Sequence, residues 1–397
     1  MSICVVKIRG QKNKVIPNPE FNMESYSITA NRIHTMTNVD GGTGSTGLLE
    51  RHYINIVNGK IVSVSTKPEF ANITDFADKY DILPGMINAH AHLELSQLKS
   101  PTQKYCNEFD QWIKQVVQFR RSPEYDPVIA ISTAKCFFEQ IHETAAVVDI
   151  VPFDLNPNQL DIGNDVTWFR YPELIAWDSV SVTKKIGQIR ELPKNYYSGL
   201  SPHAPHTAAA ELVEFAANFG VGVAMHLAES PDEMRLLKSR DGKLLEMMRK
   251  VDENYDLSKI LIGSKAMDYL QVLSNAPITL IIHGNYLVEE EIRFLAEHRE
   301  TMAVVYTPRS HDYFGFDEFP LQKMLDLRVR VLLGTDSKAS TADLCLSNEI
   351  KYAASVYPEI PLEIFFQMAT IQPANFLGIT QNYGTIEYGK NAIFTLF

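Results

Sequence analysis

The sequence has few cysteines, and they lie far apart. None of them forms a CxxC pair, and they stand at Cys4, Cys106, Cys136 and Cys345. A disulfide framework or a thiolate zinc site needs cysteines at closer, repeated spacings. We therefore expect neither, and we expect the reducing cytoplasm as the compartment.

The sequence also lacks an excess of positive charge and any long apolar run. Its 48 Asp and Glu outnumber its 37 Lys and Arg, which gives a net charge of −11. Proteins that bind nucleic acid present a basic face, so we expect no nucleic-acid partner. No apolar run reaches the roughly 18–20 residues that span a bilayer, and no basic segment followed by an apolar core opens the sequence. We therefore expect neither a membrane protein nor a secretory signal.

What is present is the composition of an ordinary globular protein. The 397 residues are 45% hydrophobic and 21% charged, which excludes a disordered chain, a collagen-like fibre and a coiled coil. At about 150 residues per domain, this length fits two or three domains or one large α/β barrel.

Short β-strands are expected near both ends of the sequence. Residues 1–22 are predicted to be an N-terminal extension. Residues 23–80 show alternating β-branched residues, and Asn58-Gly59 between two such runs indicates a hairpin. Residues 381–397 contain the turn Tyr388-Gly389-Lys390 between two expected short strands. We predict that 23–80 and 381–397 together form a small β-sandwich domain.

Residues 81–380 alternate short apolar runs with stretches of helical periodicity. The eight apolar runs are ILPGMINAH, AAVVDIV, YPELIAW, YYSGLSPH, GVAMH, ITLIIH, MAVVY and VRVLLGTD. Strands that are buried on both faces appear as continuous apolar runs. Eight strand–helix units predict an α/β fold, a (β/α)8 TIM-like barrel.

Polar residues gather where these runs end. The first run ends in His90 followed by His92, the fifth in His226, the sixth in His283 and the eighth in Asp336. The active sites of such barrels lie at the carboxyl ends of the strands. Imidazole and carboxylate are usual zinc ligands, so the pattern predicts a metal site at this end of the barrel.

Six ordered motifs at these strand ends carry a resemblance to a known family. They are LPGMINAHAHLE, SPHAPHT, MHLAESPDE, IIHGNYL, VYTPRSH and LLGTDSKAS. Together they resemble the amidohydrolase superfamily over roughly residues 24–397. The similarity is to its branch of cytosine, guanine, adenosine-type and aminofutalosine deaminases and triazine chlorohydrolases.

The resemblance implies a metal cofactor and its ligands. His90, His92, His226 and Asp336 would bind one divalent metal. We expect Zn²⁺, and Fe²⁺ stays open because these ligand types suit both ions. Binuclear members carry a carboxylated lysine at the end of the fourth strand, where this sequence has GLSPHAPHT, so one metal is expected.

The resemblance also implies three catalytic residues. Glu229 would move a proton to the ring nitrogen of the substrate, which is general acid/base catalysis. His283 would orient or deprotonate the attacking water. Asp336 would serve both as a ligand and as a proton acceptor. The alternative for Glu229 is a solvated loop carboxylate, since Asp232 and Glu233 follow it.

Six further residues are weaker candidates for contact with the substrate. His203 matches a family position that touches the substrate ring or its sugar. Glu94 either contacts the substrate or supports a ligand, and Trp112 either covers the pocket or packs in an amphipathic helix. The remaining candidates are Glu173 near the third strand and Arg309 and His311 after the seventh, where TPRSHDYFG departs from the common family pattern.

The expected activity is the hydrolytic deamination of an amino-substituted ring. A purine-like or nucleoside-like small molecule fits the motifs best, and the aminofutalosine type is the most specific hypothesis. Two alternatives stay open: hydrolysis of another leaving group (C–Cl, cyclic amide or formimino) and a non-catalytic scaffold that binds metal. Relatives commonly form homodimers, but no residue of this sequence indicates an interface.

Overall fold

The structure is a computed structural model that describes most of the chain. It covers residues 25–37, 47–76, 79–98, 109–141, 143–155, 166–193 and 196–397. The predicted extension, residues 1–22, lies outside these residues.

Eight parallel strands form the predicted barrel. They follow one another around the sheet in chain order, from the first to the eighth. Each lies within or overlaps one of the eight predicted runs, with these bounds: β8 (Met86–Ala91), β9 (Thr144–Val151), β10 (Thr167–Leu174), β11 (Gly199–Pro202), β12 (Gly222–Leu227), β13 (Thr279–His283), β14 (Met302–Tyr306) and β15 (Val331–Leu333). The fold class expected from the sequence is therefore confirmed.

The barrel closes where the end of β15 meets β8. The backbone N–H groups of Thr335 and Asp336 both donate to the carbonyl oxygen of His90, each at 3.1 Å. Gly334 permits this approach, because a Cβ at that position would lie 2.9 Å from the Cβ of His90. Closure thus brings Asp336 beside the first strand.

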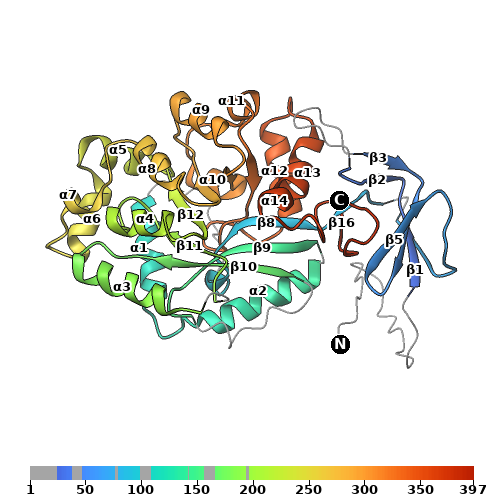
Figure 1. The fold of residues 1–397 in the computed structure, drawn as a ribbon, viewed down its shortest axis with the longest axis horizontal. Coiled ribbons are helices and arrows are strands. Elements are labelled where there is room, and N and C mark those ends of the chain that lie inside the picture. Colours follow the sequence, from blue (N-terminus) through green and yellow to red (C-terminus); the bar gives the residue numbers. More distant parts are fainter. Residues whose placement is uncertain are drawn as a thin grey trace.

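Helices surround the barrel (Figure 1). Their bounds are α1 (Phe109–Arg120), α2 (Pro127–Ile141), α3 (Ser179–Glu191), α4 (Ala210–Ala217), α5 (Pro231–Ser239), α6 (Lys243–Val251), α7 (Leu257–Ile260), α8 (Ala266–Leu273), α9 (Glu289–Glu297), α10 (Pro308–Phe314), α11 (Leu321–Asp326), α12 (Leu346–Val356), α13 (Leu362–Ala369) and α14 (Ile371–Phe376), with a 3-10 turn η1 (Leu93–Leu95) directly after β8.

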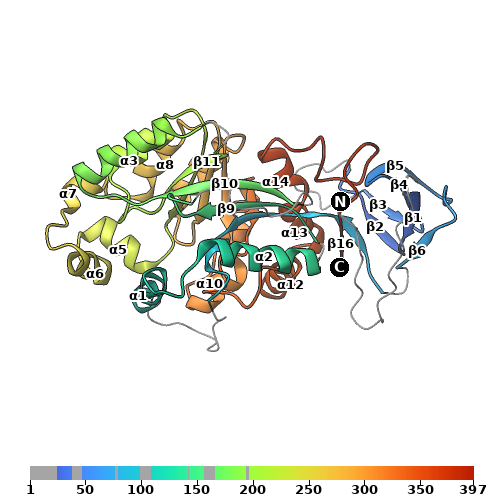
Figure 2. The same ribbon diagram turned by 90° about the horizontal axis from the view of Figure 1, so that it is seen from below.

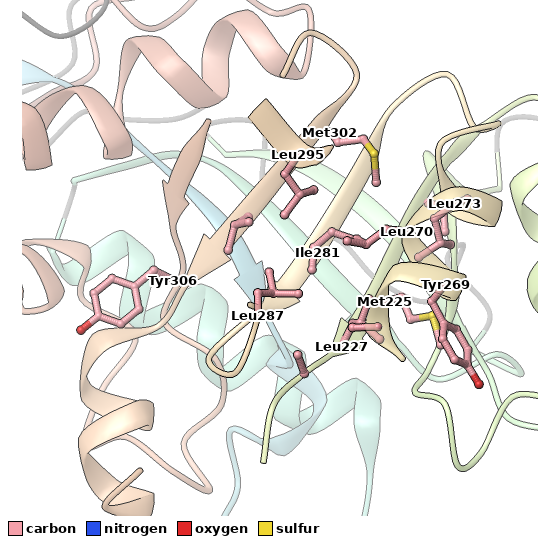
Figure 3. Packing of buried hydrophobic residues seen from close by; sticks show 14 of the residues in the cluster. Met225, Leu227, Tyr269, Leu270, Leu273, Ile281, Leu287, Leu295, Met302 and Tyr306 are labelled. Carbon is pink, nitrogen blue, oxygen red and sulfur yellow. The ribbon is translucent and has the colours of Figure 1, made fainter. Parts of the chain in front are cut away.

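Alternate residues of each strand pack inside and outside the barrel. In β13, Leu280 and Ile282 belong to the cluster that fills the interior. Ile281 belongs to the larger cluster between the strands and the helices. Figure 3 shows Ile281 beside Leu270 and Leu273 of α8. Both faces of the strand are thus buried, which explains why these strands are apolar throughout.

Two small sheets lie beside the barrel at one end of the molecule (Figures 1 and 2). One has the order β5-β4-β1-β6 and the other β16-β7-β2-β3. Their strands are β1 (Ser25–Thr29), β2 (Arg32–His34), β3 (Leu48–Glu50), β4 (Tyr53–Val57), β5 (Lys60–Ser65), β6 (Ile73–Asp75), β7 (Ile82–Pro84) and β16 (Phe394–Leu396). Isoleucines of both sheets share one core. Strands from both ends of the chain therefore build this region, as predicted.

The predicted hairpin turn has the conformation that its sequence indicates. Asn58 and Gly59 join β4 to β5 with φ angles of 51° and 71°. Asparagine and glycine tolerate this left-handed region better than other residues, so they favour a two-residue turn of this type.

Two sequence expectations differ from the structure. The first apolar run divides at Gly85, and its β7 part pairs with β16 in a small sheet while its β8 part enters the barrel. Of the two strands expected at the chain end, only β16 forms. The other segment pairs with the chain near Lys60 only through an isolated antiparallel bridge between Lys60 and Asn391, so it forms no strand of its own.

Among the described residues, no helix is both long enough and apolar enough to span a membrane.

Candidate active site

Four histidines and one aspartate meet at the carboxyl ends of the barrel strands. His90 lies in β8 with His92 just beyond it, His226 lies in β12, His283 ends β13, and Asp336 follows β15. Donor atoms of His90, His92 and His226 lie within 4.8 Å of one another, and so do those of His90, His283 and Asp336. His90 therefore links two triads, and the structure brings the whole predicted set together.

The chemistry of these donors fits a divalent cation. The two ring nitrogens of His90 and Nδ1 of His92 are buried and have no hydrogen-bond partner among the residues that the structure describes. Burial and the neighbouring imidazoles lower the pKa of His90, His92 and His283 well below the ordinary value. These rings are thus neutral with free lone pairs, which is the form that binds a metal.

The backbone at three of the strand ends is strained. Ala228, His283 and Asp336 have φ angles of 54°, 70° and 59°, although none of them is glycine. Such angles cost free energy and persist only where the surrounding structure fixes them. They turn the chain at the points where β12, β13 and β15 deliver their functional side chains.

Glu229 is held above this cluster by its own loop. The carboxylate of Glu233 accepts hydrogen bonds from the backbone N–H of Ala228 (2.7 Å) and of Glu229 (3.1 Å). The amide of Asn285 donates to the carbonyl oxygen of Glu229 at 2.8 Å. The side chain of Glu229 is only 12% exposed, so it is not a solvated loop carboxylate. Desolvation, with the charges of Asp336 and Glu233, raises its pKa well above the ordinary value.

Two serines fix Asp336, and sequence reasoning did not assign them this role. Ser310 donates to Oδ2 of Asp336 at 2.7 Å, and Ser340 lies 3.2 Å from the same oxygen. The other carboxylate oxygen, Oδ1, lies 3.7 Å from Nε2 of His90. Ser310 comes from the TPRSH segment, so the unusual motif after β14 still reaches the site.

Three of the weaker candidates lie together at one side of the histidines. Arg120 of α1 contacts Glu94 at 2.6 Å and Glu173 at 2.9 Å. Nε2 of His203 lies 3.7 Å from Glu173, and its ring centroid lies 4.9 Å from that of His226. Sequence reasoning missed Arg120, because nothing in its helix distinguishes it from Arg121, the next residue.

Asp149 of β9 is a further buried residue that the sequence analysis did not find. Its carboxylate accepts hydrogen bonds from the backbone N–H of Leu93 (2.9 Å) and from the indole of Trp168 (3.0 Å). It therefore anchors the turn η1, which carries Glu94. In the sequence, the one sign of this role is that Asp149 lies inside an apolar strand.

The last three candidates differ in their placement. Arg309 is engaged by Glu349 and Asp343, each at 2.7 Å, so the structure does not bring its guanidinium to the histidine cluster. His311 lowers the pKa of His283 and is therefore a neighbour of the site. Trp112 donates to the carbonyl oxygen of Ala339 at 2.9 Å, in the segment that follows Asp336.

Comparisons with known proteins agree with this geometry. The model of the Amidohydrolase family matches residues 181–397. The 5-methylthioadenosine/S-adenosylhomocysteine deaminase of Bacillus thuringiensis (strain Al Hakam) is 27% identical over 384 residues, which cover 87% of this chain and 80% of that protein. The protein of the same name from Pyrococcus furiosus is 26% identical over 339 residues, 79% of this chain and 74% of its own length.

Solved structures share the fold. The aminofutalosine deaminase of Helicobacter pylori in complex with methylthio-coformycin has a TM-score of 0.76 at 18% identity, and the match covers 94% of this chain and 91% of that one. An adenosine deaminase from Xanthomonas campestris with bound zinc has a TM-score of 0.63 at 20% identity, with 92% and 83% covered. Because the family model matches more than half of the sequence, the chain belongs to the amidohydrolase family.

Proposed function

We propose that this protein is a metal-dependent deaminase that hydrolyses an amino-substituted heterocycle of the purine nucleoside kind and releases ammonia. The observation that carries the proposal is the pairing of a mostly buried carboxyl group, Glu229, with a neutral imidazole, His283, beside the cluster of metal-ligand residues. Their side chains lie 3.4 Å apart. The names of the deaminase relatives support the same reaction class.

We propose that one divalent ion is held by His90, His92, His226 and Asp336. The ion would be Zn²⁺, with Fe²⁺ as the alternative that metal analysis decides. A divalent ion held there would activate a water molecule for attack at neutral pH. Ser310 would keep Asp336 oriented towards the ion through its bond to Oδ2.

Residues of the chain carry out the proton transfers. Burial raises the pKa of Glu229 well above the ordinary value, which favours the protonated carboxyl. In that form Glu229 can donate a proton to the ring nitrogen next to the carbon that bears the amino group. That carbon becomes more electrophilic. His283, whose Nδ1 lies 3.2 Å from the Thr307 hydroxyl, orients the attacking water. The water oxygen bonds to the carbon while Asp336 accepts one proton of the water and passes it to the amino group. The C–N bond then breaks and ammonia leaves, and the remaining O–H proton returns to Glu229 as the new C=O bond forms.

The test is ammonia release from a panel of amino-substituted rings. The zinc-loaded protein would be given amino-purines, nucleosides, aminofutalosine analogues, pterins and cytosine, with Asp336→Asn as the blank. We expect turnover of at least one nucleoside and none in the variant. If no compound releases ammonia while one metal ion per chain is bound, the deaminase proposal is wrong.

The metal is tested separately by its content and by reconstitution. The purified protein would be analysed for zinc and iron, stripped with a chelator, and reloaded with either ion. We expect one ion per chain and recovery of activity with Zn²⁺. Recovery with Fe²⁺ alone would overturn the zinc assignment but leave the reaction class unchanged.

A further inference from the structure

Glu233 is a buried carboxyl group that the proposed chemistry does not use, although it contacts the backbone that carries Glu229. It lies in the first turn of α5 and is only 2% exposed. Its Oε1 accepts the backbone N–H of Ala228 at 2.7 Å, and its Oε2 accepts that of Glu229 at 3.1 Å. Each oxygen of this carboxylate therefore binds one of two successive N–H groups.

The short segment that these bonds hold has a strained backbone. Ala228 has a φ angle of 54° although it is not glycine, and such an angle persists only where the surroundings fix it. The carbonyl oxygen of Ala228 accepts the backbone N–H of Tyr286 at 3.0 Å, and that of Glu229 accepts the amide of Asn285 at 2.8 Å. The segment after β13 thus holds the carbonyl groups of this turn, and Glu233 holds its N–H groups.

Both bonds require the ionised form of Glu233. An ionised carboxyl group accepts hydrogen bonds at both oxygens, whereas protonation turns one oxygen into an O–H donor. In this geometry the O–H of a protonated Glu233 would face one of the two backbone N–H groups. Two donors would then oppose each other, so one of the two bonds would break.

The surroundings of Glu233 bring this proton uptake near neutral pH. Desolvation raises its pKa to about 7, against the two backbone N–H groups, which lower it. Among the described residues, the titratable groups that face it are Glu229 on the adjoining loop and Tyr269 of α8, and neither supplies a positive charge. Above about pH 7 Glu233 therefore binds both N–H groups, and as the pH falls through about 7 it takes up a proton and releases one of them.

We propose that Glu233 is a positioning residue for the deamination, because its carboxylate fixes the backbone of Ala228 and Glu229 and this restraint weakens when Glu233 takes up a proton. The residue acts through Glu229, whose carboxyl group must meet the reacting ring, and does not itself touch the substrate. The inference rests on the proposed function and adds a pH dependence to it: kcat falls as the pH falls through about 7.

The test is the pH profile of kcat for the zinc-loaded full-length enzyme, on the substrate found by ammonia release. For the wild type we expect kcat to be about fivefold or more lower at about pH 6 than at about pH 8.5. Glu233→Gln is neutral at every pH, and its NH2 group would oppose one backbone N–H. At about pH 8.5 its kcat should be about tenfold or more below the wild type, because a misplacement of about 1 Å can cost about 100-fold. Its kcat should be nearly the same at both pH values.

Glu291→Gln is the matched control. Glu291 is the third residue of α9, as Glu233 is of α5, and is 3% exposed. Its carboxylate likewise accepts two backbone N–H groups, those of Val288 at 2.8 Å and Met267 at 3.0 Å, but neither residue carries a group of the site. Both variants should lose stability in urea to a similar extent and retain one metal ion per chain. Only Glu233→Gln should change the pH profile of kcat.

Hydrogen exchange measures the restraint without any turnover. The protection of the backbone amides of Ala228 and Glu229 would be followed by mass spectrometry with fragmentation to single residues, after correction for the intrinsic exchange rate at each pH. We expect these amides to be more protected in the wild type at about pH 8.5 than at about pH 6. Glu233→Gln should lose most of this protection, and Glu291→Gln should keep it.

The other outcomes overturn the inference or separate it from the proposed function. A wild-type kcat that does not fall as the pH falls through about 7 would overturn it without any variant. If Glu233→Gln keeps the wild-type profile, or if both variants change kcat alike, Glu233 does not position Glu229. If nothing is deaminated, the proposed function fails, and hydrogen exchange decides the restraint. Protection that Glu233→Gln abolishes would retain it, and unchanged protection would overturn it.

Discussion

The Oε1 atom of Glu229 lies 3.4 Å from Nε2 of His283, and their side chains are 12% and 4% exposed. Burial moves both groups away from their charged forms. It raises the pKa of Glu229 well above its ordinary value and lowers the pKa of His283 well below its own. The imidazole of His283 is therefore neutral near neutral pH, and the shift of Glu229 favours its protonated form. Environments that shift pKa values in this way distinguish the acid and base roles in many active sites.

The first prediction concerns Glu229. Glu229→Gln keeps the size and the neutral charge of the protonated carboxyl but cannot donate an acidic proton. We expect kcat to fall by about 10²–10⁴-fold with the bound metal retained. Steady-state kinetics on the substrate found by ammonia release, together with metal analysis, would measure this. Asp232→Asn, a carboxylate three residues further along the chain, is the control and should keep its activity; equal losses in the two variants would contradict the assignment.

A second prediction concerns the serine that holds Asp336. Ser310→Ala removes the 2.7 Å bond to Oδ2 and leaves only the longer bond from Ser340, at 3.2 Å, on that oxygen. Residues that orient a ligand affect metal affinity by about 10–100-fold, so we expect a loss of this size in the affinity for Zn²⁺. Competition with a chromophoric chelator measures it.

The control for Ser310→Ala is a second buried serine that donates a hydrogen bond to a carboxylate. Ser347 is buried and donates to the carboxylate of Glu143 at 2.5 Å. Ser347→Ala should change stability without changing the affinity for zinc. If Ser310→Ala binds zinc as tightly as the wild type, then Ser310 does not position Asp336.

The parts of the fold that repeat could be predicted from the sequence. Eight apolar runs indicated eight buried strands because strands with helices on one face and a packed interior on the other have no polar side. The clustering of the residues at the strand ends could be predicted as well, because the carboxyl ends of parallel strands lie at the same rim of the barrel. His90 and Asp336, far apart in the chain, could thus be placed together from the sequence alone.

The parts that depend on pairing across the chain could not be predicted. Arg120 reaches Glu94 and Glu173 from a helix 26 and 53 residues away, and helical periodicity does not say which polar residue turns inward. Gly85 divides one apolar run between two sheets, although a run of this kind looks the same in either sheet. Which side chain points inward and which sheet a strand joins depend on long-range partners and not on local sequence patterns.

A third prediction concerns Arg309, for which the sequence suggested substrate contact. Its guanidinium contacts Glu349 and Asp343, and its backbone N–H also donates to Glu349 at 2.9 Å. Arg309→Ala would leave the buried carboxylate of Glu349 with the backbone N–H of residue 309 but without its cationic partner, and breaking a buried ion pair in this way costs about 3–5 kcal/mol. Urea unfolding would show the loss of stability.

A double variant separates this structural role from substrate contact. Replacing both partners, as Arg309→Met with Glu349→Leu, should recover much of the stability, because no unpaired charge stays buried. The kcat/KM of the folded double variant should stay near that of the wild type. A large fall in kcat/KM without a loss of stability in Arg309→Ala would instead support substrate contact.

The last prediction concerns the pH dependence of stability and rests on His206. This residue is buried, its Nδ1 has no hydrogen-bond partner, and burial, with the neighbouring His226, lowers its pKa to about 4. In the unfolded chain a histidine takes up its proton near pH 6.5. Between these values the unfolded state binds the proton and the folded state does not, so stability is lost as the pH falls.

The His206→Asn variant isolates this contribution from those of the other buried histidines. Asparagine does not titrate, so the variant should lose about 2 kcal/mol less free energy of unfolding than the wild type between pH 7.5 and 5.0. Urea unfolding of both proteins at the two pH values, with a chelator present so that metal release does not contribute, measures the difference. Identical pH dependence in the two proteins would mean that His206 takes up its proton at the same pH in the folded and the unfolded state, and the prediction would be wrong.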